Sequence, residues 1–270
     1  MLPQAVDFRA EADDLHGLLT TLTEADWSRP TSFKGWTVND VMQHLHDGDL
    51  LAAASVAGAE AFAARRAEVA ARRAAGMTRV QEARERFGDL VGRKLLDRWH
   101  ATMTDLCDKL SAMAPDARLK WAGPDMGVRM FTTARQMETW AHGQEIVDLM
   151  GATRSATDRL RNIAEIGVRT YGWTFANRQR PTPGPAPWVR LVSPSGGIWE
   201  WNAVTPDNAV EGDALAFCQV VTQVRNVADT SLKVTGEPAT VWMSLAQCFA
   251  GPPEDPPAPG TRVSAKSAAG

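Results

Sequence analysis

The stretch Glu138-Thr139-Trp140-Ala141-His142 places two metal-binding side chains four residues apart in a segment of helical character. Positions i and i+4 share one face of a helix, so Glu138 and His142 can converge on a single point. His44, far upstream in a second helical run, can join them if the two helices pack side by side. Two imidazoles and one carboxylate suit a borderline divalent ion such as zinc and leave further positions open to water or substrate.

A Glu-x-x-x-His pair is also common on solvated helix surfaces, where it has no function. Here the pair is interleaved with apolar residues, among them Met137, Trp140 and Ile146. These neighbours predict that the polar pair is partly buried. A buried carboxylate beside an imidazole needs a partner or a cation to offset its desolvation. The spacing and its context therefore predict a metal site.

Length and composition exclude several classes of protein. The chain has 270 residues, 44% of them hydrophobic, and a formal net charge of -3. Its arginines are scattered, so nucleic acid is not an expected partner. No window is apolar for long enough to span a bilayer, and the N-terminus lacks a signal peptide, so we expect a cytoplasmic protein. Cys107, Cys218 and Cys248 are far apart in apolar contexts and are expected to be reduced core residues.

Residues 1–152 have a helical pattern throughout. The apolar spacing predicts an amphipathic helix over 4–22 and a second helix that starts near Thr37, whose hydroxyl can cap it. Residues 60–86 predict an exposed helical extension. Further helices are expected over about 87–112 and 129–150. Long helices with breaks of this kind predict a four-helix bundle, in which metal ligands project inward from facing helices.

Residues 153–252 change in character and predict a small α/β domain. A helix is expected over 156–177, followed by a proline-rich connector. Trp188–Ser193 and Ile198–Asn202 flank a Gly-Gly turn and predict a β-hairpin, with its tryptophans on the packed face. A helix over 212–227, a strand over 232–236 and a helix over 241–249 complete the domain. The tail 253–270, rich in Pro, Ala, Gly and Ser, is predicted to be disordered.

The chain resembles the DinB-like metal-dependent family, in its actinobacterial branch of mycothiol-dependent maleylpyruvate isomerases and mycothiol S-transferases. Three segments carry the resemblance: Trp27-Ser28-Arg29-Pro30-Thr31, residues 35–45 with Gly-Trp-Thr-Val ahead of His44, and residues 138–148. The resemblance implies a four-helix bundle in which His44, Glu138 and His142 hold a divalent metal, usually zinc. It also implies a sterol-carrier-like C-terminal domain and a low-molecular-weight thiol as cosubstrate, here mycothiol.

A metal-bound thiol loses its proton, and the thiolate is the nucleophilic form. We therefore expect a metal-dependent thiol S-transferase that attacks a small electrophile, for example in natural-product biosynthesis. A mycothiol-dependent cis-trans isomerase of a maleylpyruvate-like acid is the nearest alternative. A non-catalytic metal-stabilised binding protein is the other alternative, although structural zinc sites usually have four protein ligands. The expected partners are small molecules, and the chain is expected to be a monomer or homodimer.

The chain departs from the family pattern after His44, where it reads Leu45-His46-Asp47-Gly48-Asp49. His46 faces away from His44 on a helix and is expected to lie on another surface. A polar helix surface is the simpler explanation of these residues. The alternative is that Asp47 or Asp49 contacts a polar substrate, since Asp47, three residues after His44, lies near the metal face and could also orient the histidine.

Three further residues are candidates for the site. The resemblance implies that Arg225 reaches the active site, where its guanidinium would bind a substrate carboxylate; alternatively it pairs with Asp229 one turn on. Arg98 and His100 flank the inward-facing Trp99 and are candidates for the wall of the thiol-binding pocket.

Overall fold

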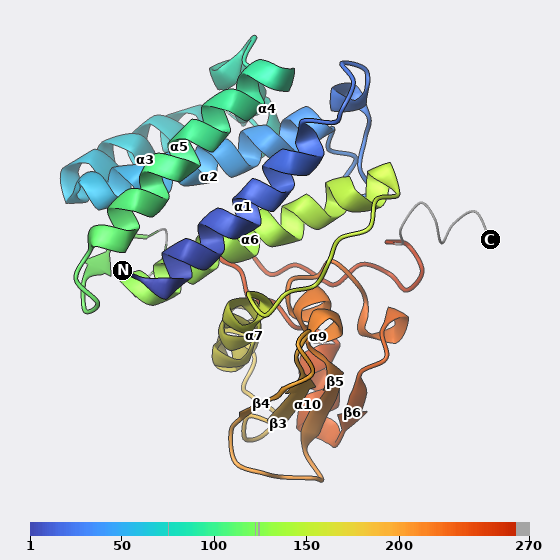
Figure 1. Cartoon of the computed structure of the whole chain (residues 1–270). Helices are drawn as coiled ribbons and strands as arrows, with labels where there is room; N and C mark the ends of the chain where they lie inside the picture. Colours follow the sequence, from blue (N-terminus) through green and yellow to red (C-terminus); the bar gives the residue numbers. More distant parts are fainter. Residues whose placement is uncertain (75, 122, 124, 263–270) are drawn as a thin grey trace. The chain divides into compact units, whose positions relative to one another are not determined.

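The computed structural model of the chain describes residues 1–74, 76–121, 123 and 125–262. The chain divides into two compact units, Met1–Leu149 and Met150–Gly270. The first unit is helical apart from one two-stranded sheet, whereas the second combines helices with a four-stranded sheet (Figure 1). None of the helices in the described ranges combines the length and the apolar character that a membrane-spanning helix needs.

Long helices make up most of the first unit (Figure 1), and side-chain contacts join α6 to α2. Helix α5 packs along both α1 and α2, and α3 and α4 also pack on α2. The elements are α1 (Pro3–Leu19), η1 (Asp26–Ser28), α2 (Val38–Ala57), α3 (Ala59–Ala74), α4 (Arg79–Phe87), α5 (Gly92–Ala112), β1 (Arg118–Leu119), β2 (Met126–Gly127) and α6 (Val128–Met150). The helices expected over 4–22 and 129–150 are confirmed to within a few residues at each end.

Helix α2 starts where its cap predicts. The Thr37 side chain accepts the backbone N–H of Asp40, and the Asp40 carboxylate accepts the backbone N–H of Thr37 at 2.8 Å. Such a reciprocal capping box satisfies two of the amide donors that every helix start leaves open. The preceding turn is tight because Lys34 and Gly35 both adopt positive φ, 52° and 69°. This turn sets the direction in which the chain enters α2.

A buried ion pair joins α2 to α6. Arg135 Nε donates to Asp49 Oδ1 at 3.0 Å, and the two side chains are 4% and 0% exposed. Trp99 Nε1, on α5, donates to the other carboxylate oxygen of Asp49 at 3.0 Å. The guanidinium lies over Gly48, where a Cβ would come within 2.7 Å of it. Because breaking such a pair costs about 3–5 kcal/mol, it fixes the position of α6 along α2.

The second unit contains a four-stranded sheet of order β4-β3-β5-β6, in which β3 and β5 are parallel and the outer strands are antiparallel to their neighbours. The predicted hairpin is confirmed as β3 and β4, with Leu191 opposite Trp199. Helix α9 follows β5 and packs on α7. The elements are α7 (Leu160–Arg169), α8 (Tyr171–Ala176), β3 (Trp188–Val192), β4 (Ile198–Trp201), β5 (Ala209–Asp213), α9 (Ala214–Val221), η2 (Val227–Asp229), β6 (Lys233–Thr235) and α10 (Glu237–Met243).

The helix predicted over 212–227 is wrong at both ends. Residues 209–213 form strand β5, and Asp213 caps α9 by accepting the backbone N–H groups of Leu215 and Ala216. At the other end Gln223 has a φ of 58°, outside the helical region. A short strand buried between two partners is stabilised by pairing that the local sequence does not reveal.

The three cysteines are confirmed as buried free thiols. Burial raises the pKa of Cys107 to about 12 and that of Cys218 well above its usual value. Since the thiolate is the reactive form, neither thiol is prepared to act as a nucleophile.

Residues 253–262, within the tail that is predicted to be disordered, make hydrogen bonds to the second unit. Gln223 Nε2 donates to the carbonyl oxygen of Glu254 at 2.8 Å, and Asn226 Nδ2 donates to that of Pro257 at 2.8 Å. These contacts hold residues 253–262 on the second unit. The amino-acid composition of this segment does not predict them, because it reports only how little apolar surface the segment itself can bury. The rest of the predicted tail, residues 263–270, lies outside the described residues.

Candidate metal centre

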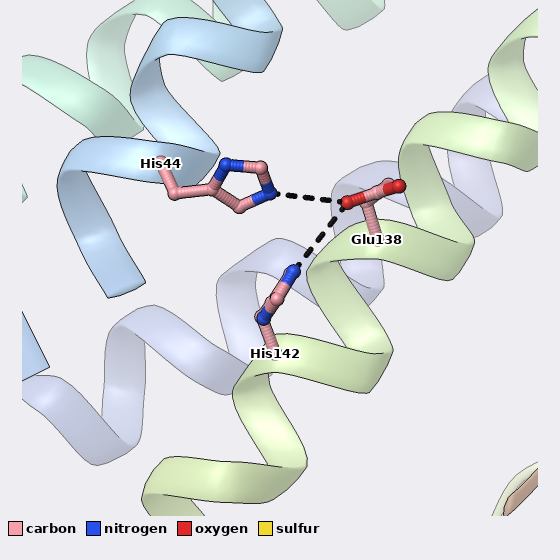
Figure 2. Close-up of side chains that lie close together, drawn as sticks. All are labelled: His44, Glu138 and His142. Carbon is pink, nitrogen blue, oxygen red and sulfur yellow. Dashed lines mark hydrogen bonds and ion pairs between the residues drawn. The ribbon is translucent and has the colours of Figure 1, made fainter. Parts of the chain in front are cut away.

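Side chains from α2 and α6 converge on one point (Figure 2). His44 Nε2 lies 3.3 Å and His142 Nε2 lies 3.5 Å from the same oxygen of Glu138, Oε2. One ligand atom from each of the three residues lies within 4.8 Å of the other two. The structure thus brings together the three side chains that the sequence indicates as ligands.

The distances fit a divalent ion. Zinc lies about 2.0–2.2 Å from imidazole nitrogen and carboxylate oxygen, so the edges of a tetrahedral site are about 3.4 Å long. The distances of 3.3 and 3.5 Å from Glu138 Oε2 to the histidine nitrogens match such edges. The side chains of His44, Glu138 and His142 remain 13%, 22% and 12% exposed, so the cluster is reachable from solvent. Three ligands with solvent access are typical of an open metal site.

The charges at the cluster differ between the two histidines. Burial lowers the pKa of His44 to about 4, so its ring is neutral at pH 7. Burial also lowers the pKa of His142, but the Glu145 carboxylate and Glu138 outweigh burial and raise it to about 9. Burial raises the pKa of Glu138, whereas hydrogen bonds from His142 and His44 hold it well below its usual value. Glu138 is therefore ionised and offers a negative charge to a cation.

Glu145 is a functional candidate that the sequence analysis missed. Its Oε1 lies 3.5 Å from His142 Nδ1, and its side chain is only 7% exposed. A carboxylate on the far nitrogen fixes the tautomer of a histidine ligand and directs its other nitrogen to the metal. The signal was present, because Glu145 follows His142 by three residues on the same helix and therefore shares its face.

Aromatic rings form one wall of the cluster. The Trp36 ring lies parallel to that of His142, with an interplanar angle of 9° and centroids 6.0 Å apart, and it meets His44 edge-on at 5.4 Å. Phe33 meets His142 edge-on at 5.1 Å. Both aromatic residues belong to the tight turn before α2, which we call the Phe33–Trp36 turn. This wall limits the directions from which water and substrate can approach the ligands.

Asp47 has partners other than the cluster. Arg65 and Arg86, from α3 and α4, each place a guanidinium nitrogen on Asp47 Oδ1, at 2.9 and 2.8 Å. These ion pairs fix α3 and α4 on α2 and occupy the carboxylate that the sequence analysis considered for substrate or His44. His46 is buried against Phe87, with ring centroids 5.3 Å apart, which agrees with the expectation that it faces away.

The candidates on α5 are also engaged elsewhere. His100 Nε2 lies 2.7 Å from Asp13 Oδ1, and its ring centroid is 4.1 Å from that of His16, both on α1. Arg98 is exposed. Among the described contacts, none joins Arg98 or His100 to the three ligands, and their place in a thiol pocket stays a prediction.

Arg225 lies in the second unit, in the loop that follows α9. Its Nη1 donates to the carbonyl oxygen of Val224 at 3.0 Å. Asp229, its expected surface partner, instead accepts the backbone N–H of Gly260 with both oxygens, each at 2.9 Å.

Residues 8–147 match the family described as the mycothiol maleylpyruvate isomerase N-terminal domain. Two uncharacterized proteins of Mycobacterium tuberculosis strains are each 38% identical to this chain over 251 residues, which cover 93% of this chain and 96% of theirs. A crystal structure of a mutant of the mycothiol-dependent maleylpyruvate isomerase has a TM-score of 0.52 and 14% identity, covering 88% of this chain and 94% of that one. That likeness is one of fold: mixed, mainly helical, with small sheets.

Proposed function

The chain belongs to the family of the mycothiol maleylpyruvate isomerase N-terminal domain, and from this premise we propose that it is an enzyme that uses a divalent metal, zinc, to activate mycothiol. The convergence of His44, Glu138 and His142 within 4.8 Å, on a partly open side of the first unit, carries the proposal. In fold, we propose a DinB-like four-helix bundle over residues 1–152 and a sterol-carrier-like domain over 153–252.

The metal would supply the acidity that a thiol lacks at neutral pH. A free thiol has a pKa of about 8.5 and is mostly protonated at pH 7. A divalent cation deprotonates a coordinating thiol outright. The proposed chemistry therefore needs a cation-binding site with room for one more ligand, which is the arrangement of the three side chains.

The residues around the cluster have separate roles in this proposal. Glu138 stays ionised and attracts the cation, and His44 stays neutral, so its Nε2 lone pair is available. The Glu145 carboxylate, 3.5 Å from His142 Nδ1, would keep a proton on that nitrogen and leave Nε2 for the metal. Trp36 and Phe33 exclude bulk water from one side of the histidine rings. Exclusion of water strengthens the electrostatic interactions on which thiolate formation depends.

We propose S-transfer as the reaction. The thiolate sulfur forms a bond to an electrophilic carbon, and the leaving group departs with the bonding electrons or the adduct takes up a proton. The carbon–sulfur bond then persists in the product. The electrophile is a small molecule. Natural-product biosynthesis is proposed as its pathway on the family resemblance alone.

Isomerisation is the second candidate, and the family description favours it. Its first step is the same addition of sulfur to carbon. After rotation about the former double bond, the carbon–sulfur bond breaks and the thiol is regenerated. The two candidates therefore differ only in the fate of the carbon–sulfur bond.

One experiment separates these reactions. Zinc-loaded protein is incubated with mycothiol and maleylpyruvate, and in parallel with mycothiol and another α,β-unsaturated carbonyl compound; products are identified by mass spectrometry. A thioether adduct supports transfer, and recovered mycothiol with a trans product supports isomerisation. Binding of mycothiol without turnover of either compound would contradict both and favour a non-catalytic binding protein. The His44→Ala variant serves as the control for uncatalysed addition.

Arg225 is proposed to bind an anionic group of the substrate through its guanidinium. The variant Arg225→Lys keeps the charge and loses the planar pair of donors. If the contact forms in the transition state, turnover falls roughly a hundredfold, equivalent to about 2–4 kcal/mol, while the thermal midpoint hardly changes. Unchanged turnover in both Arg225→Lys and Arg225→Ala would remove Arg225 from the mechanism.

A further inference from the structure

The proline-rich stretch 252–260 runs along the loop 223–229 in a regular register. Three hydrogen-bonded pairs join it to that loop: Gln223 with Glu254, Asn226 with Pro257, and Asp229 with Gly260. Each pair is separated by 31 residues along the chain. Both segments therefore advance by three residues from one contact to the next and run in the same direction.

A period of three is the period of a polyproline II helix. That helix has about three residues per turn and no internal hydrogen bonds, so its carbonyl groups are free to accept from other donors. The stretch contains Pro252, Pro253, Pro256, Pro257 and Pro259. Every third carbonyl then faces the same side, where the side-chain amides of Gln223 and Asn226 donate to two of them at 2.8 Å each.

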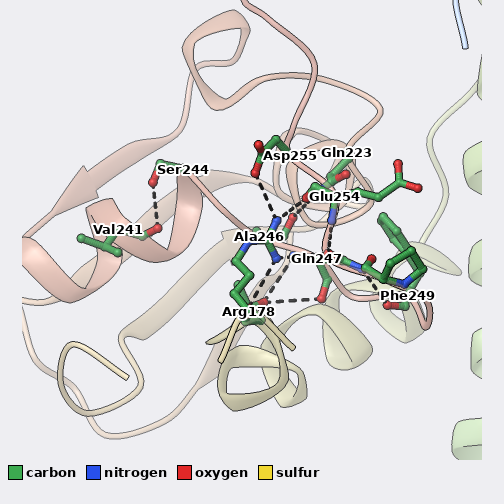
Figure 3. Close-up of polar contacts among 11 residues, drawn as sticks. Arg178, Gln223, Val241, Ser244, Ala246, Gln247, Phe249, Glu254 and Asp255 are labelled. Atoms are coloured by element: carbon green, nitrogen blue, oxygen red, sulfur yellow. Dashed lines mark hydrogen bonds and ion pairs between the residues drawn. The ribbon is translucent and has the colours of Figure 1, made fainter. Parts of the chain in front are cut away.

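Buried side chains anchor the start of the stretch (Figure 3). Gln247 is 1% exposed; its Oε1 accepts the backbone N–H of Glu254 at 3.0 Å, and its Nε2 donates to the carbonyl oxygen of Pro252 at 3.1 Å. Arg178 Nη2 donates to the carbonyl oxygen of Glu254, and Arg178 Nη1 donates to Gln247 Oε1 at 3.1 Å. Buried polar groups of this kind are costly without partners, so the attached stretch is part of the folded unit.

The loop that receives the stretch needs such support. Gln223 has a φ of 58°, a left-handed backbone that favours glycine. The next two amides, those of Val224 and Arg225, both donate to the carbonyl oxygen of Gln219 at the end of α9. Arg262, beyond the proline-rich stretch, donates back to the carbonyl oxygen of Gln223 at 2.8 Å. The contacts at 223, 226 and 229 thus bracket Arg225 on both sides.

We propose that residues 252–260 form a strap, with a polyproline II backbone up to Ala258 and a turn at Gly260, that presets the backbone position of Arg225. The strap residues are positioning residues, because they act through Arg225. This functional part rests on the proposed role of Arg225 in binding an anionic substrate group. The ordering of the loop by the strap does not depend on that role.

The test removes two of the three paired contacts between the strap and the loop 223–229 in the full-length protein. Asn226→Asp removes the amide donor to Pro257 and keeps the oxygen that accepts the Ala228 N–H at 2.9 Å. Gly260→Pro removes the N–H that Asp229 accepts and cannot adopt the φ of 73° found there. Asn202→Asp is the matched control, because Asn202 also donates to a proline carbonyl, that of Pro187 at 2.7 Å, away from the loop.

Amide hydrogen exchange and steady-state kinetics are measured on the double variant. Exchange at residues 224–229 should rise by about tenfold or more, since each lost hydrogen bond contributes a factor of about two to ten. Turnover should fall, by up to about a hundredfold, because a misplacement of about 1 Å can cost that much. Bound metal should be unchanged. The Asn202→Asp control should show neither effect.

A double-mutant cycle shows whether the strap acts through Arg225. In the Arg225→Ala background, detaching the strap should cause no further loss of turnover. Unchanged exchange in the loop would refute the strap, and increased exchange with full turnover would refute its effect on Arg225. If detaching the strap lowered turnover by the same factor in the wild-type and Arg225→Ala backgrounds, its effect on Arg225 would also be refuted. If the wild-type protein has no thiol-dependent turnover, the proposed function fails, and the exchange data alone decide whether the strap orders the loop.

Discussion

The variant Glu145→Gln tests how the protein prepares His142 for a metal. Glutamine keeps the volume and an acceptor oxygen at His142 Nδ1 but removes the negative charge 3.5 Å away. Loss of such a partner typically weakens metal binding about 10- to 100-fold. The contact is long for a charge-assisted hydrogen bond, which favours the lower end, about tenfold or about 1.4 kcal/mol.

Proton competition makes this loss depend on pH. The pKa of His142 is raised to about 9, and Glu145 is the largest of the causes that raise it. At pH 7 a metal must therefore displace one proton from His142, which weakens apparent affinity by about a hundredfold relative to pH above 9. Glu145→Gln lowers the pKa of His142 and so reduces this competition. The loss of zinc affinity in Glu145→Gln, relative to wild type, should be largest above pH 9 and should become smaller as the pH falls to 7.

Isothermal titration calorimetry of chelator-treated protein with Zn²⁺, in buffers of different ionisation enthalpy, measures both the affinity and the protons released. Wild-type protein should release about one proton per ion at pH 7, and Glu145→Gln should release fewer. Asp105→Asn, on the exposed side of α5, changes the net charge equally and should change neither quantity. The explanation given for His142 would be refuted if Glu145→Gln lost the same factor in zinc affinity at pH 7 and at pH 9.5 and released as many protons per ion as wild type.

Three further predictions concern packing, the aromatic wall and bound metal. Gly48→Ala should lower the free energy of unfolding by about 1–3 kcal/mol, because its Cβ would lie 2.7 Å from the buried Arg135 guanidinium. Gly17→Ala is the control: a Cβ there meets no atom within 4 Å, so this variant should be more stable by up to about 1 kcal/mol. Denaturant titrations measure both. Trp36→Ala should retain metal in elemental analysis but raise the KM for the thiol about three- to tenfold; metal loss would make Trp36 structural. Zn²⁺ at about a hundred times Kd should raise the free energy of unfolding by about 2.7 kcal/mol, and an unchanged melting curve would contradict a folded-state site.

The candidate ligands were predictable because their spacing has a local physical meaning. Glu138 and His142 share a helix face at i and i+4, and the Thr37 cap places the start of the helix that carries His44. That the two helices meet is a long-range fact, which the family resemblance supplied and the periodicity could not. Glu145 could also have been found from its spacing of three after His142.

Other features depend on partners distant in sequence. Asp47 lies near the helix face of His44, but its carboxylate forms ion pairs with Arg65 and Arg86 from later helices. The sequence around residue 47 does not predict these ion pairs. The tail has a composition typical of disorder, yet its carbonyl groups meet amide donors of Gln223 and Asn226 that lie 31 residues earlier. The composition of a segment reports how much surface it can bury by itself, and it does not report whether another part of the chain offers it hydrogen-bond partners.

The most direct test of the metal centre is the metal content of single-ligand variants. Wild-type protein, His44→Ala, Glu138→Ala and His142→Ala are dialysed against a common Zn²⁺ solution, and bound zinc per chain is measured by elemental analysis. His16→Ala, on α1, is the control for loss of a histidine outside the cluster. We expect about one ion per chain in the wild type and the control, and a large loss in each ligand variant while circular dichroism shows an intact fold. Undiminished zinc in all three ligand variants would contradict the central claim that His44, Glu138 and His142 hold the metal.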